Sequence, residues 1–308
     1  MLKQVLHQDL LAKREPRQLF PTLVTSVETL SAPLQEALRP HCSTESHIVR
    51  IPPGYYPFRR VVGKIHLPFG WRQTPERLLV FDPDAILIIE SNPAGLVTTT
   101  PVPRTALLKI HVFVFLLYSY FELVWVDSGH IETRTFEYNT VGERFILQGI
   151  DRLRAAYPPT LPPAPVGDQK AMLARLPLKY RNYMRDSLLP DEQLYTAIFQ
   201  PAIRQGTGLL RTYLAPDRAV GITARQLIMV ENRRDRFASE EDYATYCRFY
   251  PLAHIQHMSI ETTNEVAWLK LQHGSGGVTQ STDIALLPTN AEPLWAILQK
   301  TQGQLNFA

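Results

Sequence analysis

The 308-residue sequence has only two cysteines, Cys42 and Cys247, which lie far apart and lack the spacing of metal ligands. So low a cysteine content argues against a disulfide framework and favours a reducing compartment, so we expect a cytoplasmic protein. The first residues contain no uninterrupted apolar core, and no signal peptide is expected. No motif indicates a metal or another cofactor, and we expect neither.

Long apolar runs are also scarce. The best candidate for a membrane span is residues 112–121, because Lys109, His111 and Glu122 interrupt the wider apolar window. This run has about half of the ~20 residues that a spanning helix needs. Its valine, phenylalanine and tyrosine content favours strands. We therefore expect no transmembrane segment.

Catalytic motifs and a strong net charge are absent as well. The formal net charge of +3 is too small to indicate nucleic-acid binding, and no nucleic-acid partner is expected. The sequence has no Gly-x-Ser-x-Gly elbow, no His-Glu-x-x-His helix and no Walker phosphate loop. We therefore predict a non-enzymatic protein. The alternative is an enzyme with an unfamiliar site at the interface between two domains.

What the sequence does contain is a repeated hairpin pattern. Residues 218–231 hold two short apolar runs on either side of a mostly polar gap, and residues 77–90 hold the same arrangement 141 residues earlier. Apolar positions match at nearly every place, and the terminal arginine and glutamate are identical. The pattern predicts two buried strands joined by a tight turn. Because the segments that follow also match, we interpret the chain as a duplicated domain.

The first half is predicted to be a helical extension followed by a β domain. Residues 1–45 carry apolar residues at helical spacing and no signal for a paired strand, whereas residues 46–157 form the first domain. Thr140 and Glu143 fit a capping box at the start of a helix. One face of this helix is predicted to be buried: Ile146, Ile150, Leu153 and Tyr157. The other predicted strands are 60–67, 97–102, 107–117, 121–126 and 131–138, with a turn at 127–129.

The second half repeats this order. Five prolines between residues 158 and 167 predict a semi-extended linker, and two short basic helices complete a bridge at 158–187. The second domain is predicted at 188–308 and ends in a helix that Asn290 caps. This helix is expected to bury Leu294, Ile297 and Leu298. The other predicted elements are a strand or helix at 193–200, the hairpin, strands at 248–260, 267–272 and 278–287, and a turn at 273–277.

This order resembles that of the bacterial pleckstrin-homology-like (PH-like) domains. The resemblance rests on Ile-Thr-x-x-Gln-Leu-Ile at 222–228, Pro-Leu-x-x-Ile at 251–255, a glycine turn and a final helix. It implies an α+β, mainly β fold with two PH-like bent antiparallel sheets, each closed by a C-terminal helix, plus the N-terminal helical extension. Members of this family bind lipid headgroups, peptides or proteins. The resemblance therefore implies a binding or adaptor module whose partner is a protein or an anionic membrane surface.

The candidate ligand-binding residues lie in the basic stretch 50–77, which also carries several aromatic residues. They are Arg59, Arg60, Lys64 and Arg72. Basic and aromatic side chains together suit anionic headgroups or single-stranded nucleic acid. The alternative is a solvated strand face above core aromatics. Lipid-binding relatives of the family carry an arginine where Thr74 stands, so the phosphoinositide pattern is incomplete.

Two other clusters have simpler interpretations. His254, His257 and Glu261 could bind a metal on a helix, but on a strand the two histidines face opposite sides, so we predict surface histidines. Residues Gly274–Gly277 contain three glycines, as phosphate-binding loops do. A strand-like run follows them where such a loop needs a helix, so a hairpin turn is predicted.

Overall fold

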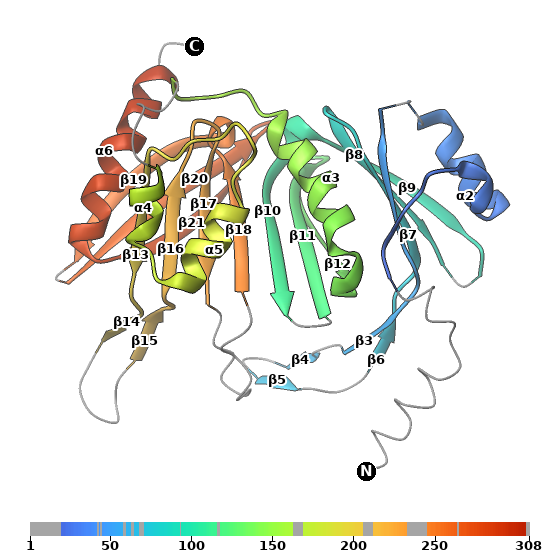
Figure 1. Ribbon diagram of the computed structural model, residues 1–308, viewed down its shortest axis with the longest axis horizontal. Coiled ribbons are helices and arrows are strands. Elements are labelled where there is room, and N and C mark those ends of the chain that lie inside the picture. Colours follow the sequence, from blue (N-terminus) through green and yellow to red (C-terminus); the bar gives the residue numbers. More distant parts are fainter. Residues whose placement is uncertain are drawn as a thin grey trace. The chain divides into compact units, whose positions relative to one another are not determined.

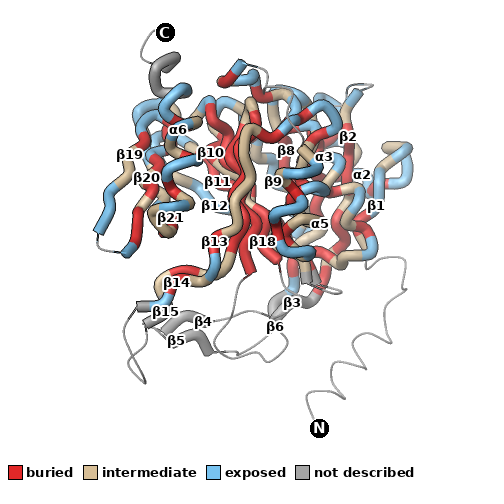
Figure 2. The backbone as a smooth tube through the Cα atoms, turned by 60° about the vertical axis from the view of Figure 1, so that its left-hand side comes forward, coloured by how far each residue is buried: buried red, intermediate tan, exposed pale blue. Residues whose placement is uncertain are grey.

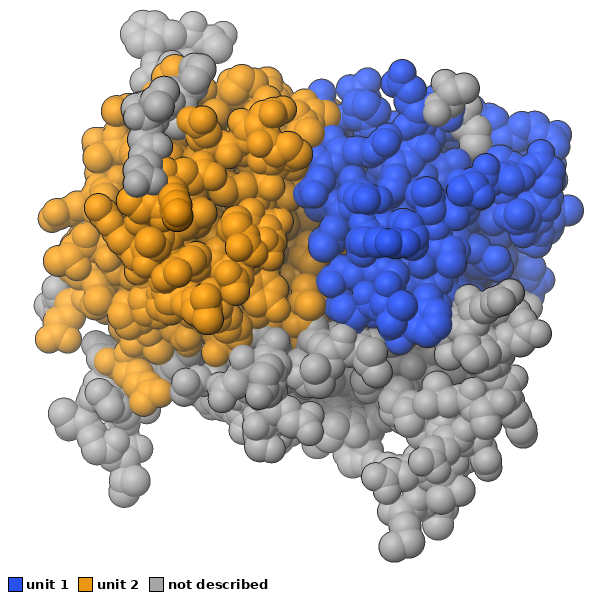
Figure 3. Space-filling model, viewed as in Figure 1, with its two compact units in different colours: residues 1–104, 117–119, 136–153 blue, residues 105–116, 120–135, 154–308 orange. Residues whose placement is uncertain are grey.

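The computed structural model describes residues 20–41, 43, 45–57, 60–62, 65–67, 71–92, 94–115, 118–162, 169–205, 212–232, 245–263 and 265–305. Over these residues the protein is α+β, mainly β, with several antiparallel sheets and no closed barrel (Figure 1). The chain divides into two compact units: residues 1–104, 117–119 and 136–153 form unit 1, and residues 105–116, 120–135 and 154–308 form unit 2 (Figure 3). These units are not the predicted domains 46–157 and 188–308, because most of residues 105–135 are grouped with the second half of the chain.

Unit 1 is built on a five-stranded sheet in the order β1-β2-β7-β8-β9. Its strands are β1 (Thr22–Leu23), β2 (His47–Ile51), β7 (Glu76–Phe81), β8 (Ala85–Ser91) and β9 (Val97–Pro103). The short helix α2 (Ala32–Leu38) buries Leu34 and Leu38 against one face of this sheet. On the opposite face, a Cβ atom at Gly149 of α3 (Glu143–Ala155) would lie 2.4 Å from the Phe81 ring, so only glycine permits this approach. Within the predicted helical extension 1–45, the structure shows helix α2, and the paired strand β1 is one that we did not predict.

Unit 2 contains a seven-stranded sheet in the order β12-β11-β10-β18-β17-β16-β13. Its strands are β10 (Leu107–Phe115), β11 (Tyr118–Asp127), β12 (His130–Tyr138), β13 (Thr196–Gln200), β16 (Arg218–Ile222), β17 (Gln226–Glu231) and β18 (Thr245–Pro251). β18 is buried along nearly its whole length and joins β10 to β17 (Figure 2). Helices α4 (Gln169–Ala174) and α5 (Leu178–Asp186) match the two predicted bridge helices.

A second, three-stranded sheet of unit 2 encloses its main core. This sheet has the order β19-β20-β21, with β19 (Ile255–Thr263), β20 (Val266–Ser275) and β21 (Val278–Leu286). The last helix, α6 (Pro288–Leu305), lies along β19 (Figure 1). As predicted, it buries Leu294 and Leu298, while Ile297 is partly buried in the same core. The two-stranded sheet β14 (Ile203–Gln205) and β15 (Thr212–Ala215) adds a small hairpin.

The two halves of the chain carry the same series of elements. The first series is β2, β7 to β12 and α3, and the second is β13, β16 to β21 and α6. Every bound of β9 to β12 recurs 148 residues later in β18 to β21, from Val97 and Thr245 to Tyr138 and Leu286. Even the 3-10 turns correspond: η4 (Arg104–Ala106) follows β9, and η8 (Leu252–His254) follows β18.

Turn geometry supports this correspondence. Ser128 and Gly129 have φ values of 47° and 82°, and the corresponding Gly276 and Gly277 have 55° and 82°. Positive φ at both central residues suits a two-residue hairpin, as predicted at both places, and explains the glycines. The Arg104 amide donates to the Asp84 carbonyl at 2.7 Å, and the Leu252 amide donates to the Arg225 carbonyl at 2.8 Å. The same backbone contact therefore follows the same strand in each series.

Both predicted hairpins are present. β7 pairs with β8 and β16 pairs with β17, each across a short turn. The two identical terminal residues face each other in both cases, with an Arg77–Glu90 ion pair at 2.8 Å and an Arg218–Glu231 ion pair at 3.2 Å. These residues match because each pair joins the open end of its hairpin.

Several predicted bounds are wrong. Residues 60–67 form two paired strands, β4 (Arg60–Val62) and β5 (Ile65–Leu67), so the chain reverses where we predicted one strand. The predicted strand 248–260 is divided between β18 and β19 by η8, which follows Pro251. The ambiguous segment 193–200 contains a strand, β13.

The predicted helix caps also differ from the observed ones. Asn139, one residue before the predicted capping box, accepts a hydrogen bond from the Val141 amide at 3.0 Å and precedes η5 (Thr140–Gly142). The carboxylate of Glu143 accepts a hydrogen bond from the Tyr138 hydroxyl, whereas a capping box would pair it with the Thr140 amide. Helix α6 begins at Pro288, a favourable first helical residue, so Asn290 lies inside it. The buried helix face that was predicted is confirmed: Ile146, Ile150, Leu153 and Tyr157.

Candidate functional site

The predicted basic site falls largely beyond what the structure describes. Arg59 and Lys64 lie outside the described residues. The backbone of Arg60 lies opposite Leu67 in the β4–β5 pair, and that of Arg72 lies opposite Tyr56 in the pair of β3 (Tyr55–Pro57) and β6 (Trp71–Gln73). The stretch 55–73 thus holds two short strand pairs, one nested within the other.

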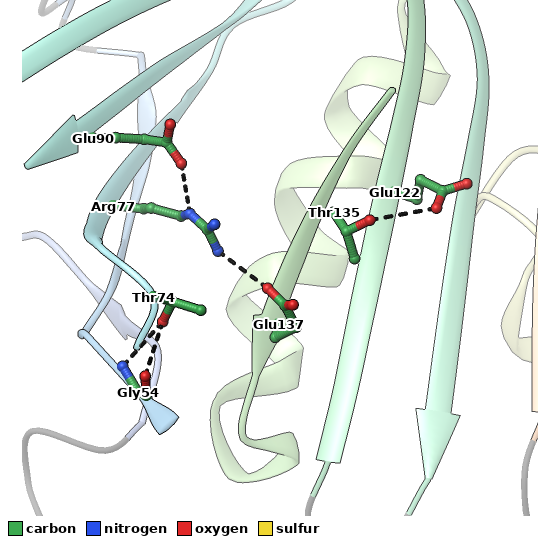
Figure 4. A network of polar contacts seen from close by, with 7 residues as sticks. All are labelled: Gly54, Thr74, Arg77, Glu90, Glu122, Thr135 and Glu137. Carbon is green, nitrogen blue, oxygen red and sulfur yellow. Dashed lines mark hydrogen bonds and ion pairs between the residues drawn. The ribbon is translucent and has the colours of Figure 1, made fainter. Parts of the chain in front are cut away.

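The two basic residues at the ends of the stretch 50–77 are already neutralised. Arg50 binds Glu76 at 2.6 Å. Arg77 is buried and lies between Glu90 at 2.8 Å and Glu137 at 3.5 Å (Figure 4). Because these guanidinium groups already bind carboxylates, they contribute little to attracting an anionic surface.

Thr74, at the base of the nested pairs, has a structural role. Its side chain is buried, and its hydroxyl oxygen accepts a hydrogen bond from the Gly54 amide at 3.0 Å (Figure 4). The Thr74 amide in turn donates to the Gly54 carbonyl at 2.9 Å. An arginine at this buried place would lose the hydroxyl contact and bury a charge, so threonine suits the position structurally.

The outer edges of β10 and β19 differ between the two series, although the two strands correspond. In the first series, the outer edge of β10 is paired with β18, with Ile110 opposite Phe249 and Val112 opposite Cys247. The guanidinium carbon of Arg154, near the end of α3, lies 3.8 Å from the centre of the Phe249 ring. In the second series, β19 occupies the place of β10, but within the described part of the chain no strand pairs with its outer edge.

A groove runs between this edge of β19 and helix α6. It has a volume of about 260 Å³. β19 contributes Ile260 and Thr262, and β20 contributes Ala267, which lies opposite Thr262. The helix contributes Pro288, Ala291, Glu292 and Trp295, which lie on one face of α6 because Ala291 and Glu292 are three and four residues from Pro288 and four and three from Trp295. We call this the β19–α6 groove.

Contacts at the start of α6 hold the helix in place beside β19. The side-chain amide of Asn290 donates to the Phe199 carbonyl and to Gln200 Oε1, both at 3.0 Å. Gln200 Oε1 also accepts from the Leu287 amide at 2.7 Å. One end of α6 is thus fixed to β13, and the buried Leu294 and Leu298 hold the neighbouring face of the helix against the core. The groove is therefore supported by regular elements on both sides.

The backbone of β19 is suited to accept another strand. The Leu252 amide bonds to the Arg225 carbonyl, in the same register as the β17–β18 ladder. Because backbone groups point alternately to the two sides of an antiparallel strand, the even-numbered residues of β18 bond to β17. The odd-numbered residues of β18 therefore direct their backbone groups toward β10. The even-numbered residues of β10 therefore face β18. The counterparts Ile260 and Thr262 present their amide and carbonyl groups at the outer edge of β19, and residues 255–263 contain no proline.

Three buried or partly buried charged residues of unit 2 form a structural cluster. Glu231, whose side chain is only 5% exposed, binds Arg218 at 3.2 Å and Arg248 at 2.9 Å. These three residues lie on the neighbouring strands β16, β17 and β18. Two guanidinium groups surround one carboxylate, so the cluster favours a single register of the three strands.

Titratable groups on β10 and β11 form a second cluster. His111 Nδ1 donates to Glu122 Oε1 at 3.1 Å. Figure 4 shows the second contact of this carboxylate, in which the Thr135 hydroxyl donates to Oε2 at 3.4 Å. The hydrogen bond from His111 is the main cause that lowers the pKa of Glu122. Burial lowers the pKa values of His111 and Lys109. His111 is therefore neutral and Glu122 ionised near neutral pH, and neither is poised for proton transfer there.

His273 on β20 is fully buried and stacks on Tyr250, with ring centroids 5.1 Å apart. Neither ring nitrogen has a hydrogen-bond partner within the described part of the chain. Burial lowers its pKa to about 3, and the charges of Lys109, His254 and His111 add to this effect. This histidine is therefore held neutral inside the core.

Acid should destabilise the protein through His273. The unfolded chain takes up a proton below its ordinary pKa of about 6.5, whereas the folded chain does so only near 3, so stability is lost as the pH falls between these values. From about pH 8 to pH 5 we expect this histidine alone to lower the unfolding free energy by about 2 kcal/mol. Denaturant unfolding of the His273→Phe variant should lack that share of the acid loss. The exposed His257→Phe variant is the control, and equal acid losses in wild type and His273→Phe would contradict the assignment.

Metal ligation and the larger surface depression give weaker candidates. Within the described ranges no group of three or more His, Cys, Asp or Glu side chains is placed to hold a metal, and His257 is exposed on β19. A depression of about 580 Å³ lies beside β1 and β2 in unit 1. Its polar groups are engaged: His47 Nε2 donates to the Phe145 carbonyl and Arg152 donates to the Glu45 carbonyl, both at 2.7 Å.

Comparison with protein-family models and with curated proteins gave no match for this sequence. Over the described residues, no helix combines the length and the apolar character that crossing a membrane requires. The β19–α6 groove was not predicted from the sequence. Its sequence signals are a strand without proline and a tryptophan, Trp295, in the last helix; the partial exposure of Trp295 is seen only in the structure.

Proposed function

We propose that this protein is a non-enzymatic binding module built from two PH-like repeats, residues 46–157 and 188–308. It binds a partner protein by accepting an extended segment of that partner as an additional strand on β19. The side chains of the segment pack in the β19–α6 groove. The cellular location that this proposal implies remains the cytoplasm, as the cysteine content suggests.

The repeated series of elements supports the PH-like assignment. The second series has four strands in one sheet, three in another and then a helix, and α6 packs into the core that both sheets share. The first series has the same order of strands, 3-10 turn and helix. This order agrees with a bent antiparallel sheet that a C-terminal helix closes.

One observation carries the choice of a protein partner. The edge of β10 in the first series already holds an antiparallel strand, β18, whose Phe249 packs against Arg154 of the following helix. The edge of β19 has the same place in the second series and the same helix beside it. An edge of this kind offers backbone hydrogen bonds for affinity and side-chain pockets for specificity.

The membrane and enzyme alternatives have less support. For the membrane, two of the basic residues in the stretch 50–77 bind carboxylates, which leaves Arg59, Arg60, Lys64 and Arg72 as the candidates for contact with an anionic surface. For the enzyme alternative, burial or hydrogen bonding moves the pKa values of His111, Glu122 and His273 away from neutrality. Membrane binding therefore serves as an alternative outcome of the test below.

We predict that Thr262→Pro abolishes partner binding and leaves the fold intact. Thr262 is exposed, and its amide faces the outer edge, so proline removes a donor that no strand of the described chain uses. A photo-crosslinking residue at position 260 in the native cell should capture a partner through one short segment. A peptide of that segment should then bind wild type, and affinity should fall at least tenfold in Thr262→Pro, as a loss of more than about 1.4 kcal/mol requires.

Thr262→Ser keeps the amide and is the matched control, and all variants must keep the wild-type melting temperature. Partner binding that is unchanged in Thr262→Pro would contradict strand addition. Binding to anionic vesicles that is lost on neutralising Arg59, Arg60, Lys64 and Arg72, with no captured segment at β19, would favour the membrane alternative instead.

A further inference from the structure

The pairing of β10 with β18 joins one strand of the first series to one strand of the second. The strands that correspond to these two in the other series, β19 and β9, each lie at the edge of a sheet. β9 corresponds to β18, and β19 corresponds to β10, each 148 residues apart. Both are outer strands: β9 ends the five-stranded sheet and β19 ends the three-stranded sheet. If the β10–β18 joint were repeated between molecules, β19 of one copy would pair with β9 of the next.

We propose that β9 and β19 form complementary surfaces of two copies of this chain, and that Pro101 prevents their pairing. The inference shares the β19 edge with the proposed function but requires no partner protein. A pairing of this kind joins two different surfaces, so without the block it would extend into chains or rings.

The backbone hydrogen bonds of β9 show which of its residues face the outer edge of the five-stranded sheet. The Arg104 amide bonds to the Asp84 carbonyl, and Val102 lies opposite Ile86 in the same ladder. Because inward and outward groups alternate in an antiparallel pair, the even-numbered residues of β9 bond to β8. Thr99 and Pro101 therefore face outward, as Cys247 and Phe249 do where they meet β10.

If β9 and β19 paired in the register of β18 and β10, one residue of β9 would be unable to make the equivalent contact. Phe249 lies opposite Ile110, and the corresponding residues are Pro101 and Met258. Phe249 has a backbone amide at this place, whereas Pro101 has none and its ring projects toward the incoming strand. An edge proline is a known means of preventing association between sheets.

The neighbouring proline does not have this effect. Pro103 corresponds to Pro251, which lies beyond the residues of β18 that pair with β10, since the paired stretch ends at Phe249. A proline at this place is therefore compatible with the joint. Pro101 is the position at which β9 differs from the strand that does pair.

The remaining residues of the two edges favour association. β9 carries Thr98, Thr99 and Thr100, which are uncharged and suited to strands. In the transferred register, Glu261 faces Thr98 and Ser259 faces Thr100, so no like charges are opposed.

The test restores the missing amide. We expect Pro101→Thr, which extends the threonine run without adding apolar surface, to form concentration-dependent oligomers in sedimentation-velocity experiments. At the same concentrations wild type should keep one mass. Pro103→Thr is the matched control and should behave as wild type. The double variant Pro101→Thr/Thr262→Pro should return to the wild-type mass, because it blocks the β19 edge.

Three outcomes would overturn the proposal: a folded Pro101→Thr with the wild-type mass at every concentration, equal association of Pro103→Thr, or oligomers that persist in the double variant. If Pro101→Thr unfolds, Pro101→Ala restores the same amide and replaces it. The two proposals can fail separately. Partner binding by the single variant Thr262→Pro tests the proposed function, whereas self-association of the single variant Pro101→Thr tests whether Pro101 prevents the pairing of β9 with β19.

Discussion

Replacing Glu231 by glutamine should destabilise the protein by about 3–5 kcal/mol, the usual cost of removing one member of a buried ion pair. The carboxylate lies between Arg218 and Arg248 with little exposure to solvent, so the variant leaves two positive charges together in the sheet. The free energy of unfolding, measured by urea denaturation, gives this value directly.

The exposed Glu261–Lys270 ion pair provides a control of the same chemistry. Its carboxylate side chain is 59% exposed, so Glu261→Gln should change stability by less than about 1 kcal/mol. Similar losses in Glu231→Gln and Glu261→Gln would show that the buried cluster does not hold β16, β17 and β18 together.

Truncating Leu298 to alanine should cost about 2–5 kcal/mol, the usual range for a fully buried leucine. Leu298 is completely buried in the core that α6 shares with both sheets of unit 2. Thermal and urea unfolding both measure the loss. Gln299→Ala, one residue further along the exposed side of the helix, should have little effect.

A loss below about half a kilocalorie for Leu298→Ala would mean that α6 does not close the second series. The closing role of this helix also matters for the groove, because a loosely held α6 could not form one wall of a binding site.

The elements that depend on local pattern could be predicted from the sequence. The hairpins at 77–90 and 218–231 followed from two apolar runs around a polar gap, and the helix face at Ile146 and Ile150 followed from its spacing. Glycines at the 127–129 and 273–277 turns were equally informative, because these places need positive φ. Short-range periodicity is sufficient for such elements.

Bounds failed where the chain changes direction without a change in composition. We predicted one strand over 248–260, yet a 3-10 turn after Pro251 divides this segment between two sheets. The proline was visible in the sequence, and so was its counterpart Pro103. Only the matching element bounds of the two series show that both mark the same turn.

The candidate groove could not be predicted, because it depends on which strand lacks a neighbour. The pairing of β10 with β18 joins residues more than a hundred positions apart, and nothing in either strand specifies the other. The charge of the basic stretch 50–77 predicted an anionic ligand, yet Arg50 and Arg77 at its ends already bind carboxylates. Charge in a sequence is visible, whereas its neutralisation depends on the fold.

The most direct test of strand addition at β19 is residue-resolved amide hydrogen exchange with and without a bound partner segment. Strand addition predicts alternating protection: exchange at Ile260 and Thr262 should slow strongly, because their amides face the outer edge. The amides of Ser259 and Glu261 should change little, because they face β20. Uniform protection along β19, or protection confined to residues 55–73, would contradict the proposed binding mode.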